Sequence, residues 1–264
     1  DEASLYATRD ICAAIYRYET YHFHKALYIV GSAQKLYFQQ LFKVIELMGY
    51  AWAKDLVHID FGWVKFKQVM MSTRKGNIVL LEDVLNKSID LALKIIKEKN
   101  PDLENKEKVA FDVGIGAVIF ANLFTRRNKD IDFDWDKVLN FEGETGPYVQ
   151  YTHARLCSLI RKYGQPVENQ VYFKSLSTEE EHRLIKRLED FPRRIKSSAR
   201  EYDPALICSY LIELASLFNR FYQKERIITE NVESTKARML LVKAVQTVIK
   251  SGLSILGIKS PEKM

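Results

Sequence analysis

The chain has 264 residues, 47% of them hydrophobic and 28% charged, a balance that supports a buried core and excludes collagen-like, low-complexity and wholly disordered chains. Three scattered cysteines without a CxxC pair argue against a disulfide framework and a zinc site, and no apolar run reaches the about 20 residues of a membrane helix. The formal net charge is +6, and we expect two domains in a soluble, cytoplasmic protein.

Basic residues are unevenly divided along the chain. Residues 1–147 hold 20 Lys and Arg against 21 Asp and Glu, whereas residues 148–264 hold 20 against 13. Clustered Lys and Arg side chains release counterions when they meet phosphates, so the second half suits a polyanion. A basic, solvated face without a partner explains an excess of this size equally well.

The first half alternates strand-like and helix-like segments, the pattern of an α/β layered domain. A short apolar run at 26–31 predicts a buried strand, and apolar residues at helical spacing over 33–48 predict the helix that follows. Residues 56–66 are rich in β-branched and aromatic residues around Gly62, so they predict a strand or a bent pair of strands.

Two helices are expected after a polar loop at 72–77, over residues 82–99 and 107–124. Gly114 and Gly116 lie inside the second helix, where glycine costs helix propensity. Their presence therefore indicates close approach of another backbone.

Helical periodicity alone remains from Tyr148 onward, and we place the domain boundary there. Thr178 precedes three glutamates and predicts an N-cap, because first-turn carboxylates favour a helix N-terminus. The predicted architecture is α/β plus all-α, with domains at 1–147 and 148–264. Four helices are expected in the second domain: 148–163, 177–200, 204–228 and 234–256.

The loop at 72–77 gathers hydroxyls, cations and a glycine between a strand and a helix. Arg74 and Lys75 can neutralise charge that develops on a transferring phosphoryl oxygen, and Gly76 allows the loop to change conformation. The spacing is not that of a P-loop, GxxxxGK[ST]. An exposed polar turn is the alternative.

Polar residues at the start of the first helix and just after the 26–31 strand are candidates for a ligand site. Tyr6 and Asp10 share one helix face and suit a cationic ligand, although first-turn amides can satisfy the carboxylate instead. Gln34 follows the 26–31 strand, where open α/β sheets bind ligands, or it is simply a polar residue at a helix start.

Three histidines allow more than one interpretation. His22 and His24 would share a face of a strand, but without a third ligand surface histidines are the default. His58 lies in the apolar run 56–66 and is either a satisfied, half-buried histidine or a contact to a nucleotide base.

Aromatic and basic residues share helix faces in the second half. Tyr148, Tyr151 and Arg155 lie at i, i+3 and i+7, and rings beside arginine are what hold unstacked nucleic-acid bases. Packing in the bundle core is the alternative, which we favour for Phe218, while Tyr222 lies at a polar border.

The order of motifs along the chain resembles arginyl-tRNA synthetases. The matching segments cover almost the whole chain: LYATRD at 5–10, IVGSAQ at 29–34, MSTRKGN at 71–77, GIGAVIF at 114–120, EGETGPYVQYTHAR at 142–155 and LGIKSPEKM at 256–264. The resemblance implies a partial Rossmann-like catalytic domain of class I and a helical anticodon-binding bundle of the DALR type. It implies ATP-dependent attachment of L-arginine to an arginine tRNA through an arginyl-adenylate.

The resemblance also assigns roles to residues. Three contact the substrate arginine: Tyr6, Asp10 and Gln34. Four are catalytic, in the loop where the class carries KMSKS: Ser72, Thr73, Arg74 and Lys75. Three contact ATP: His58, Gly62 and Met71. Four shape a pocket for the anticodon: Tyr151, Arg155, Tyr222 and Met264. ATP enters with Mg²⁺ as a substrate, and no tightly bound protein metal is expected.

Two departures from the class pattern shape the expectations. Met70 and Thr73 stand where KMSKS has its lysines, and nothing in the chain matches the HIGH motif. We therefore expect the C-terminal portion of a longer monomeric enzyme, inactive alone and without a membrane partner. A tag after Met264 should harm tRNA binding.

Three alternatives stay open. The chain could be a non-catalytic tRNA-binding module derived from a class I synthetase, although such a module has no need of an arginine site. It could be a cysteinyl-type synthetase, which the missing zinc ligands and the MSTRKGN loop disfavour. It could also be a plain helical interaction protein.

Overall fold

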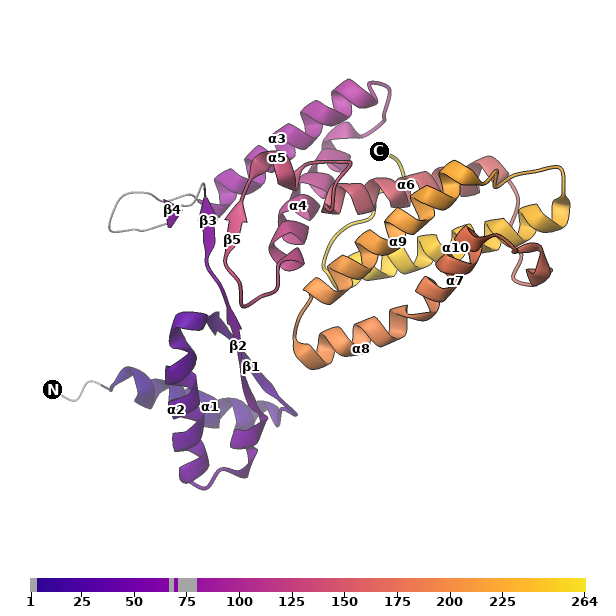
Figure 1. Ribbon diagram of the computed structural model, residues 1–264. Coiled ribbons are helices and arrows are strands. Elements are labelled where there is room, and N and C mark those ends of the chain that lie inside the picture. Colours follow the sequence, from indigo (N-terminus) through magenta and orange to yellow (C-terminus); the bar gives the residue numbers. More distant parts are fainter. Residues whose placement is uncertain (1–3, 67–68, 71–79) are drawn as a thin grey trace. The chain divides into compact units, whose positions relative to one another are not determined.

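The computed structural model describes residues 4–66, 69–70 and 80–264 (Figure 1). The chain forms two compact units, and it passes from one to the other more than once. The first consists of Asp1–Val64 and Arg127–Ile131, and the second of Lys65–Arg126 and Asp132–Met264. The loop residues Met71, Ser72, Thr73, Arg74 and Lys75 lie outside the described residues.

The first unit is built on two parallel strands, β1 and β2, paired from Ala26 opposite Leu56 to Gly31 opposite Phe61. Its core gathers aromatic and aliphatic residues such as Phe38, Ile45 and Trp52. The predicted strands and helix are confirmed, and the run at 56–66 forms two strands that are separated at Gly62 and Trp63. The elements are α1 (Tyr6–Tyr21), β1 (Ala26–Gly31), η1 (Ser32–Gln34), α2 (Lys35–Leu47), η2 (Ala51–Asp55) and β2 (Leu56–Phe61).

β1 differs from the expected buried strand. Its side chains alternate in exposure, and Leu27 and Ile29 are 47% and 67% exposed. Tyr28 and Val30, on the other face, pack against the core. The strand is therefore covered on one face only within this unit.

The chain runs between the units through short strands. β3 (Val64–Phe66) is the middle strand of a small sheet, antiparallel to β4 (Val69–Met70) and flanked on its other edge by β5 (Ile131–Phe133). The one-turn helix α5 (Trp135–Val138) follows β5.

Two long helices, α3 (Leu81–Lys99) and α4 (Lys106–Phe124), begin the second unit and pack on each other. A Cβ on Gly114 would lie 2.8 Å from Ile89 Cα, so the expected close approach of a backbone is confirmed there. Gly116 instead faces the side chains of Gln150 and Ile258. Because α4 also packs on the bundle helices, the domain boundary at Tyr148 falls inside this unit and stays a prediction.

The bundle in the described part of the chain has five main helices where four were expected. The expected helix at 177–200 is two helices, because Pro192 lacks the N–H that would continue the first one. Phe218 is fully buried, as favoured from the sequence. The helices are α6 (Gly146–Tyr163), α7 (Glu179–Glu189), α8 (Phe191–Glu201), α9 (Ala205–Lys224) and α10 (Val232–Ile255), with η4 (Phe173–Ser175) before α7.

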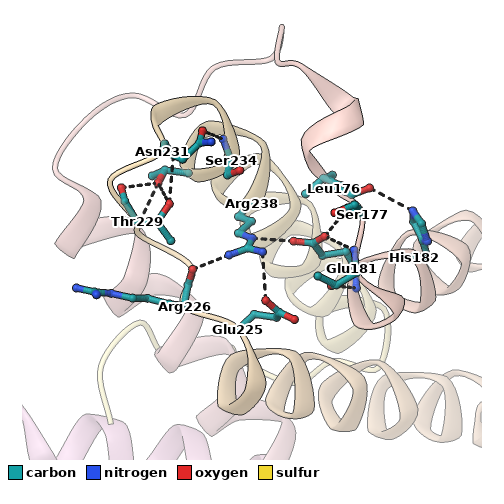
Figure 2. A network of polar contacts seen from close by, with 12 residues as sticks. Leu176, Ser177, Glu181, His182, Glu225, Arg226, Thr229, Asn231, Ser234 and Arg238 are labelled. Atoms are coloured by element: carbon teal, nitrogen blue, oxygen red, sulfur yellow. Dashed lines mark hydrogen bonds and ion pairs between the residues drawn. The ribbon is translucent and has the colours of Figure 1, made fainter.

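A buried ion pair joins α7 to α10 (Figure 2). The expected N-cap at Thr178 is confirmed, and Glu181 completes a capping box there, accepting backbone N–H bonds from Ser177 and Thr178 at 2.8 and 2.9 Å. Arg238 donates to its Oε1 from Nε at 2.7 Å and reaches Arg226 O at 2.7 Å. Burial alone would raise the pKa of Glu181, but these donors hold it below its usual range.

None of the helices in the described ranges is long and apolar enough to cross a membrane.

Candidate functional site

An arginine held between two tyrosines forms the centre of the site on the helical bundle. Arg155 of α6 places its guanidinium carbon 4.9 Å from the ring centre of Tyr151 and 5.2 Å from that of Tyr222 on α9. The tyrosines stay 40% and 41% exposed. Part of each tyrosine side chain is therefore open to a ligand.

Asn219 fixes this arrangement and was missed from the sequence. Its Oδ1 accepts from Arg155 Nη1 at 2.5 Å, while its Nδ2 donates to Tyr148 Oη at 3.0 Å and Thr152 Oγ1 at 3.1 Å. A guanidinium can only donate hydrogen bonds, so Arg155 requires the side-chain oxygen of Asn219, and not its nitrogen, to face it. Asn219 lies three residues before Tyr222 and hence on the same face of the helix, which was the signal in the sequence that could have identified it.

Two hollows adjoin the cluster. The four residues assigned to the anticodon line one of about 560 Å³ together: Tyr151, Arg155, Tyr222 and Met264. The other, of about 660 Å³, shares Tyr151, Arg155 and Met264 and adds Lys99 and Phe141. The ammonium of Lys99 lies 5.7 Å from the ring centre of Phe141. The walls thus offer cations and aromatic faces side by side, although Glu142, Asp102 and Glu104 also reach them.

A third hollow, of about 600 Å³, lies along α7 and α8 and is lined by five of the 20 basic residues of the second half. Most of these cations already have partners: Asp190 binds Arg187, Arg193 and Arg194, and Glu213 binds Arg187. Burial opposes ionisation of Asp190, but the bonds from Arg194 and Arg193 hold its pKa below the usual range. This surface therefore presents less net charge than its arginines suggest.

In the first unit, Tyr6 and Asp10 gather around Tyr37, which the sequence analysis missed. Tyr37 Oη donates to Asp10 Oδ2 at 2.5 Å, and its ring centre lies 5.7 Å from that of Tyr6. Burial and the nearby carboxylate raise the pKa of Tyr37. Gln34 is exposed at the end of η1, directly after the carboxyl end of β1.

His58 and Gly62 have structural partners of their own. His58 Nε2 lies 3.0 Å from Val30 O, and its ring stacks on Phe38 at 4.5 Å, which favours the half-buried histidine. Gly62 donates to Arg127 O at 2.7 Å, and a Cβ there would lie 2.3 Å from Lys129 O. Their roles toward ATP stay predictions.

The strand face expected for His22 and His24 is wrong. His22 ends α1 in the left-handed region with φ 44°, because the chain turns there toward β1. Within the described residues, no group of three or more His, Cys, Asp or Glu side chains is placed to hold a metal ion.

Two family models match the chain. Residues 1–135 match the catalytic domain of class I tRNA synthetases (R), and residues 149–264 match the DALR anticodon-binding domain. The second matched segment contains all four residues of the hollow on the bundle: Tyr151, Arg155, Tyr222 and Met264.

Curated relatives and solved structures agree with these matches. The whole chain is 51% identical to part of an arginine–tRNA ligase of Halothermothrix orenii and 46% identical to part of one from Clostridioides difficile, covering 47% of each. The arginyl-tRNA synthetase of Thermus thermophilus aligns with a TM-score of 0.84 at 32% identity, over 91% of this chain and 41% of that one. The chain thus spans about half the length of its curated relatives.

Proposed function

The chain belongs to the class I arginyl-tRNA synthetases, and from this premise we propose that it forms part of an arginine–tRNA ligase. The whole protein joins L-arginine to its tRNA in two steps. The arginine carboxylate attacks the α-phosphorus of ATP, which arrives with Mg²⁺, and releases pyrophosphate. A ribose hydroxyl of the tRNA then attacks the arginyl-adenylate carbonyl and releases AMP. We place this enzyme in the cytoplasm as a monomer without a membrane partner.

The bundle's part in this reaction is to read the anticodon. The single observation that carries this proposal is that Tyr151, Arg155, Tyr222 and Met264 line one hollow. Exposed tyrosine faces stack on unpaired bases, and a guanidinium meets phosphates or base edges. Asn219 holds Arg155 between the rings, so little order has to be gained when RNA arrives.

The first unit supplies part of the arginine site. The Asp10 carboxylate faces the guanidinium of the substrate in a charge-assisted pairing, and Tyr6 lies beside it. Tyr37 orients the carboxylate by donating to Oδ2. Gln34 contacts the same substrate from the end of η1.

ATP and the activation chemistry fall to the remaining assigned residues. His58, Gly62 and Met71 contact ATP, and Ser72, Thr73, Arg74 and Lys75 stabilise the charge that develops as the carboxylate attacks. Because the chain spans about half of its relatives, we expect these groups to work only with the rest of the enzyme.

The test is binding of this chain to an arginine tRNA and to the same tRNA changed at the central anticodon base, in a salt series. We expect the altered base to cost about 1–3 kcal/mol, with the same salt slope for both RNAs. Equal affinities would mean that the basic half senses only phosphates, and the anticodon assignment would be withdrawn. A parallel assay should detect no arginylation by the chain alone; product formation would overturn the expected incompleteness.

A further inference from the structure

The last residues of the chain are held by side chains that come from other elements. After α10, Gly257 turns the backbone with φ +75°, and Ile258 is buried. Residues 259–264 then run without regular secondary structure. We call residues 258–264 the tail segment.

Four side chains donate to main-chain oxygens of the tail segment. Gln150 Nε2 reaches Lys259 O at 2.8 Å, and His153 Nδ1 lies 2.9 Å from Pro261 O. Arg161 reaches Glu262 O at 3.2 Å, and Asn100 Nδ2 reaches Met264 O at 3.1 Å. Each bond is made to the backbone, so it fixes the path of the segment whatever the side chain at that position.

Three of these donors form one stripe on α6. Gln150, His153 and Arg161 are three and eight residues apart, which brings them to one helix face. Tyr151 and Arg155 lie on the neighbouring stripe and line the hollow that contains Met264. Helix α6 therefore holds the tail segment by hydrogen bonds and also forms one wall of the hollow. The tail segment forms another part of that wall through Met264.

The bonds of His153 define its protonation. Pro261 O can only accept, so Nδ1 carries the hydrogen, as assigned from the hydrogen-bond network. Gln246 Nε2 lies 3.1 Å from Nε2, and because Gln246 Oε1 accepts from Lys243, its amide nitrogen faces the imidazole. Nε2 must then be an unprotonated acceptor. His153 is fully buried, and burial with the nearby Lys250 and Lys243 lowers its pKa, which the bond to Pro261 O and the charge of Glu262 only partly offset.

Gln150 is placed to donate rather than to fill space. It is fully buried, and its two amide hydrogens go to Asp112 O on α4 and Lys259 O on the tail segment. Its Oε1 is buried without a hydrogen-bond partner among the described residues. An apolar side chain of equal size would avoid that unpaired acceptor but could not bind the tail segment.

We propose that Gln150 and His153 are positioning residues that hold the tail segment so that Met264 stays in the anticodon hollow. This inference rests on the proposed function. If the hydrogen bonds from Gln150 and His153 to the tail segment are lost, Lys263 and Met264 leave the hollow, while the aromatic and basic residues on α6 and α9 remain. Discrimination between anticodon bases then falls, and the phosphate-dependent part of binding stays.

The test is a double-mutant cycle in the 264-residue chain. One variant is Gln150→Met, which keeps the volume and removes both donors; the other lacks residues 261–264. We expect each to reduce the preference for the correct anticodon about 10-fold, and the combination to be no worse than either. If Gln150 only supported the bundle, Gln150→Met would lower the anticodon preference further even when residues 261–264 are absent. Additive losses of preference in the double variant would therefore overturn the proposal.

Two further measurements keep the result interpretable. Asn100→Ala removes the bond to Met264 O from the α3–α4 connection and leaves α6 intact, so it serves if Gln150→Met fails to fold. Because Asn100 also lines both hollows, its readout is the release of Met264 and not RNA binding. Carboxypeptidase should release Met264 faster from Gln150→Met and from Asn100→Ala than from the parent chain, and unchanged release in both would overturn the proposal without reference to RNA. Gln165→Met, in an exposed loop, is the matched control.

The two proposals fail differently. If the parent chain does not distinguish the two tRNAs, the anticodon assignment is wrong. If the parent chain distinguishes them and Gln150→Met does so equally well, only the positioning role is wrong.

Discussion

The helical bundle and the parallel strand pair bury their apolar residues to very different degrees. The cluster in the bundle contains 22 buried residues, among them Phe218 and Leu211 at 0% exposure, whereas the cluster in the first unit contains seven. On β1, Leu27 and Ile29 are exposed although Tyr28 and Val30 are covered. The first unit is the more apolar of the two, with 39 hydrophobic residues among its 69 against 51 among the 117 residues of 148–264, so burial depends on what packs against a face, not on the residues of that face alone.

The largest effect should come from the centre of the bundle. We expect Phe218→Ala to lower the free energy of unfolding by about 3–5 kcal/mol, because a large cavity replaces a fully buried ring. Denaturant unfolding followed by circular dichroism measures this loss. In a Trp135→Phe background the remaining tryptophans, Trp52 and Trp63, both lie in the first unit, so their fluorescence reports whether the strand pair unfolds separately. A loss below about 1 kcal/mol would contradict the tight packing of α9.

The ion pair of Figure 2 offers a test of comparable size. Arg238→Met leaves Glu181 buried without its charged partner and should cost about 3–5 kcal/mol of stability. Because folding lowers the pKa of Glu181, its stabilising contribution is present above the unfolded-state pKa of about 4.3 and is lost as the pH falls through the folded-state value. Unfolding measured from pH 3 to 7 should therefore show a shallower acid slope in Glu181→Gln, and an unchanged slope would exclude this coupling.

A surface change should separate binding from stability. We expect Tyr222→Ala to weaken binding of an arginine tRNA by about 1–3 kcal/mol, because a stacking face is lost, with little effect on unfolding. The matched control is Tyr172→Ala, an exposed tyrosine away from the hollow. Equal losses from both variants would show that the effect is not specific to the hollow.

The smallest effect on stability should come from the open face of β1. Ile29→Lys should change the free energy of unfolding by less than about 0.5 kcal/mol, because the side chain is already 67% exposed. It should also reduce self-association, since an exposed apolar strand favours contact between molecules. Light scattering across a concentration series measures the self-association. Unchanged scattering would mean that molecules do not associate through this face.

Features set by local chemistry were predictable from the sequence. The N-cap at Thr178, the division of the 56–66 run into two strands at Gly62 and the glycine contact at Gly114 follow from capping and from the absence of a Cβ. Features set by distant partners were not. Tyr37 beside Asp10 and Asn219 beside Arg155 join residues 27 and 64 positions apart, and periodicity continued through the helix break before Pro192.

The interrupted path of the chain has a consequence for synthesis. The first unit contains Asp1–Val64 but also Arg127–Ile131, where Arg127 donates to Asp60 O at 2.7 Å and accepts from Gly62. A ribosome that adds about 5–20 residues per second delivers this second piece several seconds after the first. During that interval the strand pair lacks its closing residues, and α3 and α4 emerge before it is complete. A nascent chain stalled just before residue 127 should therefore be more open to proteases in its first 64 residues than one stalled well beyond residue 131.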